Sequence, residues 1–451
     1  MLRPISWKGA PCIGLLRQTR GYITSLYLGG DKAKQQYAVL TPFMDFKGTL
    51  GDPQMEKSIK WRNASAEQFQ DVKEKFKIYS AMKETIARLE SERESIAKEI
   101  RASKLEEPSL KAKGKQLREE VKNLKENFYP LESDFICQYL RLPNYLHEKT
   151  PEVHPQLLFR NGLPSTSNKT GDHIPNHLDR KDLVDFTNKF TYYLLDEAAN
   201  FDWEFPQSCV DVFLKNNFTA VTCPDFSRSV LVEAALIPKE NVHEIAEEDT
   251  SKINSLHLTG GGSLLGFLGY IAKLSIYSTV LPLKLVTSGR KYSEGNCTSS
   301  NLEGLYTTVQ SNVVEVFIGA QTSEKADLEI EATLNLVVDI YKELGLLFRI
   351  QYLPAPQLGL SEILRASIQV YSPKYEQYIE VGNLSHYSDF ISKRLLFNVT
   401  GKKEKTFPHI VAGTVADVTK IIACLIENGK STKVVKKTTC VDKFEDIFSV
   451  R

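Results

Sequence analysis

Basic side chains crowd one stretch of this 451-residue sequence. They are Lys104, Lys111, Lys113, Lys115, Arg118, Lys122 and Lys125. Several cations on one face would bind an RNA backbone with strongly salt-dependent affinity. Because the net charge is only +1, any such binding must come from a local patch of this kind. Acidic residues are nearly as numerous nearby, so a solvated, salt-bridged surface is the alternative, and composition leaves both interpretations open.

Two other patterns exclude common kinds of chemistry. The seven cysteines are scattered, without a CxxC pair or a His/Cys cluster at metal-ligand spacing, which indicates isolated thiols. The glycines at 260–262 lack the Lys-Ser/Thr pair that a phosphate-binding loop requires. We therefore expect neither a cofactor nor a metal site.

The basic residues lie in a segment with helical periodicity. From Phe69 to Ile100 apolar residues recur mostly in steps of three and four, and a second such run extends from Leu117 to Phe135. Pro108 separates the runs, so the pattern predicts an antiparallel coiled-coil hairpin of two helices, each about 45 Å long. Pro130, inside the second run, predicts a kink or an end of the helix there.

The remainder mixes helical and strand patterns. A linker is expected at 157–170. Helices are expected at 182–200, 208–216, 326–344 and 415–427, and strands at 218–224, 281–288, 311–320, 348–353, 367–371 and 378–384. Since strands outnumber crossover helices, we predict an α+β body with an antiparallel sheet flanked by helices.

The first thirty residues contain no Asp or Glu, while Arg3, Lys8, Arg17 and Arg20 alternate with apolar residues. This composition predicts a mitochondrial transit peptide, residues 1–30, that is cleaved between Arg20 and Asp31. A tail of accidental composition is the alternative. The expected domains are then 31–150, with the arm at about 65–130, and 151–451. No apolar run reaches the ~18 residues of a transmembrane helix, so no membrane insertion is expected.

Several short segments, in this order, resemble the seryl-tRNA synthetase family, particularly its synthetase-like mitochondrial members in insects. They are Leu142–His147, Phe218–Pro224, Leu281–Phe317, Pro356–Gly359, Glu380–Phe390 and His409–Gly413. The resemblance runs from about residue 65 to 430. It implies a class II synthetase body preceded by a tRNA-binding arm. It also implies a dimer whose interface includes Pro224.

The resemblance also locates the family's catalytic positions. Three arginines that would hold ATP fall on Ser293 (the register could shift by one), Thr307 and Lys420. The glutamate that would bind the serine ammonium group falls on Gly261. Losing one such donor typically costs about 10² to 10³ in rate. We therefore expect a degenerate site without ATP binding.

Other positions near this site differ less from the family. Arg290 and Lys291 could partly replace the first arginine. Glu315 and Glu380 are kept, and we expect them to form hydrogen bonds within the sheet, with a residual metal site as the alternative. Ser367 and Gln369 stand where the family has acidic residues.

The function implied is that of a non-catalytic paralogue in the mitochondrial matrix. It would bind tRNA, serine tRNA above all, and would form a homodimer or a heterodimer with the active mitochondrial seryl-tRNA synthetase. One alternative is a protein-interaction scaffold without an RNA role, because coiled coils serve both purposes. Another is an active ligase in which Arg290 and Lys420 act as substitutes.

Overall fold

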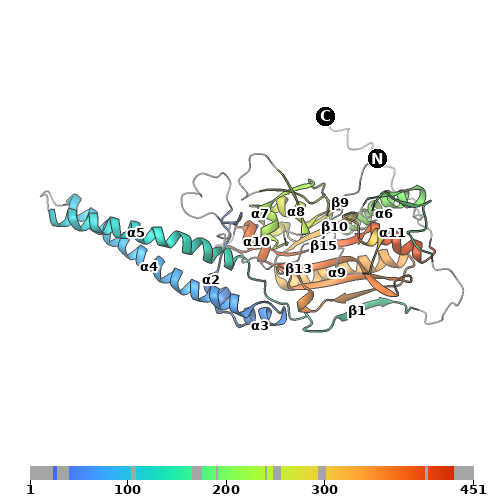
Figure 1. Cartoon of the computed structure of the whole chain (residues 1–451), viewed down its shortest axis with the longest axis horizontal. Helices are drawn as coiled ribbons and strands as arrows, with labels where there is room; N and C mark the ends of the chain where they lie inside the picture. Colours follow the sequence, from blue (N-terminus) through green and yellow to red (C-terminus); the bar gives the residue numbers. More distant parts are fainter. Residues whose placement is uncertain are drawn as a thin grey trace, which may run out of the picture.

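The structure is a computed structural model. It describes residues 24–27, 40–102, 108–164, 175–188, 191–238, 241–246, 255–292, 301–401 and 405–430. A long helical hairpin projects from one end of a body built on a β-sheet (Figure 1). No helix among the described residues is long and apolar enough to cross a membrane. Most of the predicted leader lies outside the described residues, and only 24–27 are placed.

The predicted arm is confirmed. It is built by α4 (Ala66–Ala102) and α5 (Pro108–Tyr139). Lys75 pairs with Asp134 near the base, and Lys113 pairs with Glu92 near the tip, so the helices run antiparallel. The seam that the three-and-four spacing predicts is apolar and buried. Its distal part consists of Leu89, Ile96, Leu117 and Val121.

Two buried arginines tie the arm to the body. Arg62, just after α3 (Pro53–Trp61), donates a hydrogen bond to the carbonyl oxygen of Gly359 at 2.9 Å. Arg394 donates to the carbonyl oxygen of Leu140, just after α5, at 2.6 Å. Burial lowers the pKa of both guanidinium groups, to about 10 and about 9 respectively. Because the two guanidinium groups are buried, the backbone carbonyl oxygens replace the hydrogen bonds that water would otherwise make. These contacts hold the base of the arm in place.

An eight-stranded sheet forms the centre of the body, in the order β1-β11-β12-β13-β15-β10-β9-β4. Its strands are β1 (Gln156–Asn161), β4 (Thr219–Ala220), β9 (Leu283–Tyr292), β10 (Gln310–Ala320), β11 (Phe348–Tyr352), β12 (Leu364–Ser372), β13 (Gln377–Ser388) and β15 (His409–Asp417). All neighbours are antiparallel except β4 and β9, which are parallel. The predicted α+β class is confirmed, and β4 lies at an edge.

Helices cover both faces of this sheet. On the first, here called the helix face, three helices pack on alternate strand residues such as Val314 and Val316: α6 (Asp196–Lys215), α9 (Ser323–Glu343) and α11 (Val418–Glu427). On the opposite face, Leu285 and Phe317 pack with the base of the arm and with α7 (Ser229–Ala234), α8 (Leu264–Ile271) and α10 (Phe390–Leu395). The short elements that complete the body are α2 (Phe46–Gly51), β2 (Val184–Phe186), β3 (Tyr192–Leu194), β5 (Phe226–Arg228), β6 (His243–Ile245), β7 (Leu256–Leu258), β8 (Ser275–Tyr277), β14 (Asn398–Thr400), η2 (Ser278–Val280), η3 (Gly304–Tyr306) and η4 (Ala355–Gln357).

Most predicted elements overlap observed ones of the same type, but two predictions in the middle of the chain are wrong. Residues 182–200 were expected to be helical, whereas β2 and β3 form a hairpin and α6 begins only at Asp196. The β-branched and aromatic residues of this segment favour extended strands over a helix. The expected linker 157–170 instead begins with β1, whose hydrogen bonds to β11 extend the sheet at its edge, and its second part, 165–170, lies outside the described residues.

Three boundaries also differ. The closing helix was expected from residue 415, but β15 continues to Asp417, whose carboxylate accepts the Lys420 N–H and starts α11 there. The expected strand 218–224 is reduced to the two residues of β4. Pro130 does not end the second arm helix, which continues to Tyr139. A proline removes only one helical hydrogen bond, and the packing of α5 on α4 outweighs that loss.

Candidate functional site

The opposite face of the sheet also carries a group of polar side chains, beside the part that α7, α8 and α10 cover. This side of the sheet is called the polar face below. Arg365, Ser367 and Gln369 alternate along β12 and therefore point to the same side. Glu380 of β13 accepts hydrogen bonds from Arg365 at 2.5 Å and from the Ser367 hydroxyl at 2.6 Å. Arg365 also lies 3.3 Å from Glu362. Its positive charge is thus shared by two carboxylates of the same chain.

The polar face continues to an arginine at its far end. Arg349 of β11 donates to the Gln369 side chain at 2.8 Å. Its guanidinium group also lies over the ring of Tyr378, 4.1 Å from the centroid. Burial lowers the pKa of Arg349. Ser367 and Gln369 therefore connect Arg349 to Glu380 by hydrogen bonds.

Glu315 of β10 is the centre of a second polar cluster. It is buried, accepts a hydrogen bond from Thr414, and lies 3.6 Å from the ammonium group of Lys291. Burial raises the pKa of Glu315, and the positive charge of Lys291 opposes this shift. Glu315 and Glu380 thus both form hydrogen bonds within the sheet, as expected.

The side chains of Arg290 and Lys291, the two residues that we expected to substitute for an arginine, point in opposite directions. Lys291 lies on the polar face with Glu315, whereas its neighbour Arg290 lies 3.5 Å from Asp202 of α6, on the helix face. Lys291 donates to Thr414 at 2.8 Å. Only Lys291 is therefore positioned on the polar face, and there it already has partners.

Gly261 has no room for a side chain. A Cβ atom at this position would lie 2.7 Å from the carbonyl oxygen of Cys223. Its backbone N–H donates to the Asp225 carboxylate at 2.7 Å, which holds the loop against the segment after β4. A glutamate could not occupy this position without a shift of the backbone.

The structure places the other positions that we expected to be degenerate as follows. Thr307 is half-buried after η3 and donates to the carbonyl oxygen of Gly304 at 3.2 Å. Lys420, in the first turn of α11, lies 3.1 Å from Asp417, whose carboxylate raises the pKa of the lysine. Ser293 lies outside the described residues. The ammonium group of Lys420 is therefore neutralised by the residue that caps its own helix.

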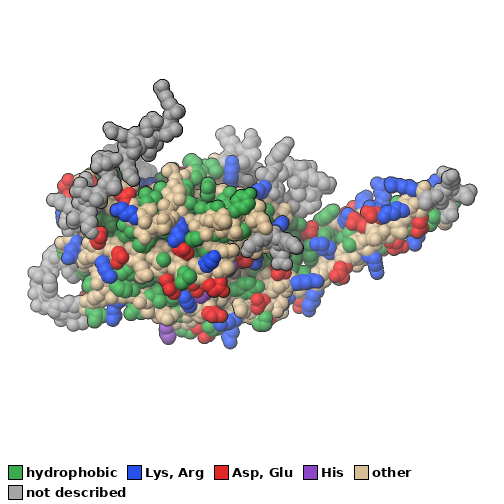
Figure 2. Space-filling model, turned by 180° about the vertical axis from the view of Figure 1, so that it is seen from behind, with side chains coloured by type: hydrophobic (Ala, Val, Ile, Leu, Met, Phe, Trp, Pro, Cys, Tyr) green, Lys and Arg blue, Asp and Glu red, His purple; other side chains and the backbone are tan. Residues whose placement is uncertain are grey.

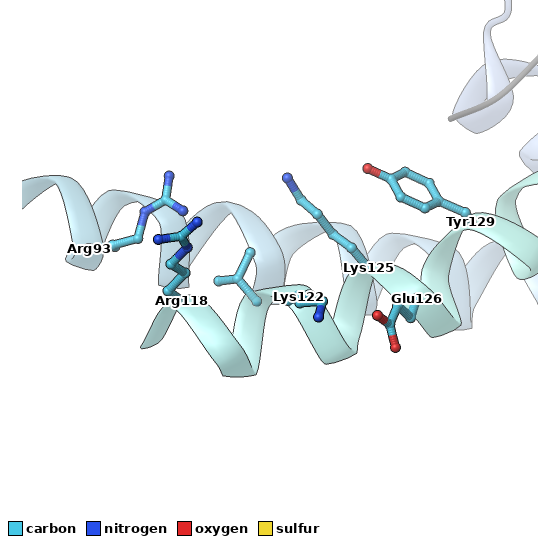
Figure 3. A pocket seen from close by; sticks show the side chains of 7 residues that line it. Arg93, Arg118, Lys122, Lys125, Glu126 and Tyr129 are labelled. Atoms are coloured by element: carbon cyan, nitrogen blue, oxygen red, sulfur yellow. The ribbon is translucent and has the colours of Figure 1, made fainter. Parts of the chain in front are cut away.

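The arm carries a second candidate site, a groove of about 340 Å³ between α4 and α5. It is lined by Arg93, Arg118, Val121, Lys122, Lys125, Glu126 and Tyr129. Figure 3 shows Arg93 and Arg118 side by side, directed to the same side as Lys125 and Tyr129. Within the described chain no acidic side chain pairs with Arg93, Arg118 or Lys122. Two adjacent guanidinium groups of this kind favour an anion, which both can bind with several donors.

The other predicted basic residues divide into two groups. Lys113 and Lys125 pair with Glu92 and Glu90 of α4, at 3.0 and 2.6 Å. Lys111 and Lys115 are exposed on the outer surface of α5, and Lys104 lies outside the described residues. Basic and acidic side chains are accordingly interspersed along the arm (Figure 2). The groove contains Arg93, which we did not predict, because only the register of the hairpin brings it beside Arg118.

The predicted interface residue Pro224 is exposed, close after the edge strand β4. Two apolar residues on the outer side of α6 are also exposed: Trp203 to 75% and Leu214 to 41%. A tryptophan exposes so much apolar area only rarely in the absence of a partner. This side of α6 was not predicted as a contact surface.

Comparisons with known proteins agree with this architecture. No family model matches the chain. The Drosophila melanogaster protein named serine–tRNA synthetase-like protein Slimp is 39% identical over 429 residues, which cover 93% of this chain and 91% of that relative. The chain belongs to the seryl-tRNA synthetase family. The mitochondrial serine–tRNA ligase of Mus musculus is 28% identical over 372 residues, 77% of this chain and 72% of the ligase.

Solved structures of the family share the fold. The seryl-tRNA synthetase of Pyrococcus horikoshii, complexed with ATP, has a TM-score of 0.75 at 19% identity, covering 85% of this chain and 94% of that structure. The cytoplasmic serine–tRNA ligase of Naegleria fowleri, in complex with AMP, has a TM-score of 0.72 at 16% identity, covering 86% and 92%. The arm and the body of this family member are therefore both part of the common architecture.

Proposed function

We propose that this chain is a non-catalytic paralogue of seryl-tRNA synthetase that binds tRNA, serine tRNA above all, in the mitochondrial matrix. The observation that carries the proposal is Gly261, where a side chain would collide with the Cys223 carbonyl oxygen. A glutamate side chain, which would bind the serine ammonium group, therefore does not fit at this position. The charges of Arg365, Lys291 and Lys420, moreover, are each matched by carboxylates of the chain itself. Phosphates of ATP would have to compete with these carboxylates.

We predict that the purified protein shows no serine-dependent ATP–pyrophosphate exchange. Each missing donor costs about 10² to 10³ in rate, so the rate should lie at least about 10⁴-fold below that of an active mitochondrial seryl-tRNA synthetase assayed in parallel. Gly261→Glu should not restore exchange and should lower the thermal midpoint, because its Cβ has no space. Serine-dependent exchange above a heat-inactivated control would overturn the proposal.

RNA binding is supported by the groove on the arm. Phosphate contacts need cations and hydrogen-bond donors but no ATP site, so they can persist when catalysis is lost. Arg93, Arg118 and Lys122 supply those cations, and Tyr129 adds an aromatic ring at the end of the groove on which a base can stack. The relatives named as serine–tRNA ligases act on tRNA, which makes tRNA the RNA to test first.

We further propose that the chain dimerises through β4 and the outer side of α6. The partner is a second copy or the active mitochondrial seryl-tRNA synthetase. An edge strand leaves backbone groups unpaired on one side, and the exposed Trp203 on α6, the helix that precedes this strand, supplies an apolar anchor. A heterodimer would let the active subunit perform the chemistry. Co-purification from mitochondria decides between the two partners. Recovery of the synthetase would support the heterodimer, and recovery of this chain alone would support the homodimer.

The mitochondrial location is supported by the acid-free basic leader and by the mitochondrial ligases among the relatives. The docked residues 24–27 restrict where that leader can end. Glu233 of α7 accepts hydrogen bonds from the Thr24 hydroxyl at 2.6 Å and from the Ser25 N–H at 2.7 Å. Leu26 is only 1% exposed, in the same core as the base of the arm.

We therefore predict that the mature protein begins at or before Thr24 and retains this contact. Removal of Thr24–Tyr27 would leave Glu233 without these donors and expose the cavity that Leu26 fills. Mass spectrometry of the N-terminal peptide from isolated mitochondria measures the start directly. A mature N-terminus beyond Tyr27 would contradict the prediction.

A further inference from the structure

Three side chains able to bind a metal meet on the helix face of the sheet, away from the polar face and the groove. His147 follows the arm, Asp327 lies in the second turn of α9, and His386 lies in β13. Their ligand atoms all lie within 4.8 Å of one another. His147 Nε2 is 3.3 Å from Asp327 Oδ2, and His386 Nδ1 is 3.8 Å from Asp327 Oδ1.

The side chain of the deepest member of this cluster has no hydrogen-bond partner among the described residues. His386 is 0% exposed, and neither of its ring nitrogens is paired. The Oδ1 atom of Asp327 is likewise buried and unpaired. Buried polar atoms are nearly always satisfied, so an imidazole and a carboxylate oxygen that face each other unpaired indicate an ion or a water between them.

We propose that His147, Asp327 and His386 form a structural binding site for Zn²⁺. Two imidazoles and one carboxylate are ligands that zinc prefers, with a water as the fourth. In a tetrahedral site with bonds of 2.0–2.1 Å, neighbouring ligand atoms are about 3.3 Å apart. His147 Nε2 already has this spacing to Asp327 Oδ2, whereas the 3.8 Å of His386 Nδ1 is measured to the other oxygen, Oδ1. The Asp327 carboxylate must therefore turn so that one of its oxygens serves the ion together with both imidazoles.

The ion has one competitor, the side chain of Lys149. Its ammonium group lies 3.3 Å from Asp327 Oδ2 and 3.3 Å from Glu331. Its backbone N–H also donates to His147 Nδ1 at 3.1 Å. If zinc binds Nε2 of His147, Nδ1 of the same ring must carry the proton. Nδ1 can then no longer accept the hydrogen bond from the Lys149 N–H, and this exposed amide must donate to water instead. Because the Lys149 side chain is 41% exposed, its ammonium group can move away from Asp327 towards solvent while it keeps its ion pair with Glu331.

The site would join three parts of the fold. His147 belongs to the segment between the arm and the body, whereas Asp327 and His386 belong to a helix and a strand of the body. One ion would therefore fasten the segment after the arm to the sheet and to α9. The scattered cysteines gave no sign of it, and we expected no metal from the sequence.

The test uses the full-length protein, stripped with EDTA and titrated with ZnCl₂ by calorimetry and with Co²⁺ by visible absorption. We expect one zinc per chain and an intense Co²⁺ band of tetrahedral type. His147→Gln and Asp327→Asn should weaken zinc binding at least about tenfold, since each removes a ligand. Lys149→Met should tighten it severalfold, because it removes the competing cation.

His154→Gln is the matched control, because His154 is exposed and lies outside the cluster. It should bind zinc like the unaltered protein and give the same Co²⁺ spectrum. His147 is partly exposed, so its variant is expected to fold, and circular dichroism checks this. Zinc stoichiometry that is the same in His147→Gln and in the unaltered protein would overturn the proposal. So would the absence of a tetrahedral Co²⁺ spectrum.

Discussion

Changing Arg93, Arg118 and Lys122 together to alanine is expected to weaken tRNA binding about tenfold to a hundredfold at low salt. These residues line the groove between the arm helices, and within the described chain none is paired with an acid. Each phosphate contact releases counterions from the RNA, so losing three contacts should flatten the plot of log affinity against log salt by about two to three units of slope. Fluorescence anisotropy with labelled serine tRNA over a range of KCl concentrations measures both quantities.

A second triple variant with the same change in charge serves as the control. Arg160, Lys325 and Lys342 are exposed on the body, on β1 and α9, and their replacement should leave the affinity and the salt dependence nearly unchanged. Equal losses in both variants would mean that tRNA responds only to total charge. If the unaltered protein fails to bind any tRNA at low salt, the arm serves protein partners and the scaffold alternative is favoured.

Trp203→Ala is expected to shift the protein from dimer to monomer, with a dissociation constant raised about thirtyfold or more. Exposed tryptophans that become buried in an interface are typical hot spots, and their truncation costs about 2 kcal/mol or more. Trp203 projects from the outer side of α6, whereas the adjacent Asp202 points inward to Arg290. Sedimentation velocity over a concentration series, for this chain alone and mixed with the active synthetase, gives the dissociation constants.

Leu328→Ala provides a matched control for this interface. Leu328 is a similarly exposed apolar residue, at 65%, but it lies on α9 and not on α6. Its replacement should not change the association. Retention of a full-strength dimer in Trp203→Ala would exclude the outer side of α6 from the interface.

Local patterns predicted what lies within single elements. The arm follows from apolar spacing inside two uninterrupted segments, and β9 to β13 follow from runs of β-branched residues. The wrong prediction at 182–200 was also made from a local pattern. The two strands there have only three residues each, so their alternation cannot be distinguished from part of a helix.

What could not be predicted depends on register between elements. Arg93 meets Arg118 only because of how α4 and α5 pair, and the spacing within either helix does not reveal it. His147, Asp327 and His386 come from three segments that the fold alone brings together. The lack of space for a side chain at Gly261 is due to the carbonyl group of Cys223, and the sequence does not show that the two are close.

The anchoring of the arm by Arg62 and Arg394 has a mechanical consequence. With 37 residues, α4 extends about 55 Å from its base, so it acts as a lever. A tilt of one degree at the base displaces the tip by about 1 Å, roughly a third of a hydrogen-bond length. Two guanidinium groups clamped on backbone carbonyl oxygens thus determine how accurately the distant end of the molecule is aimed.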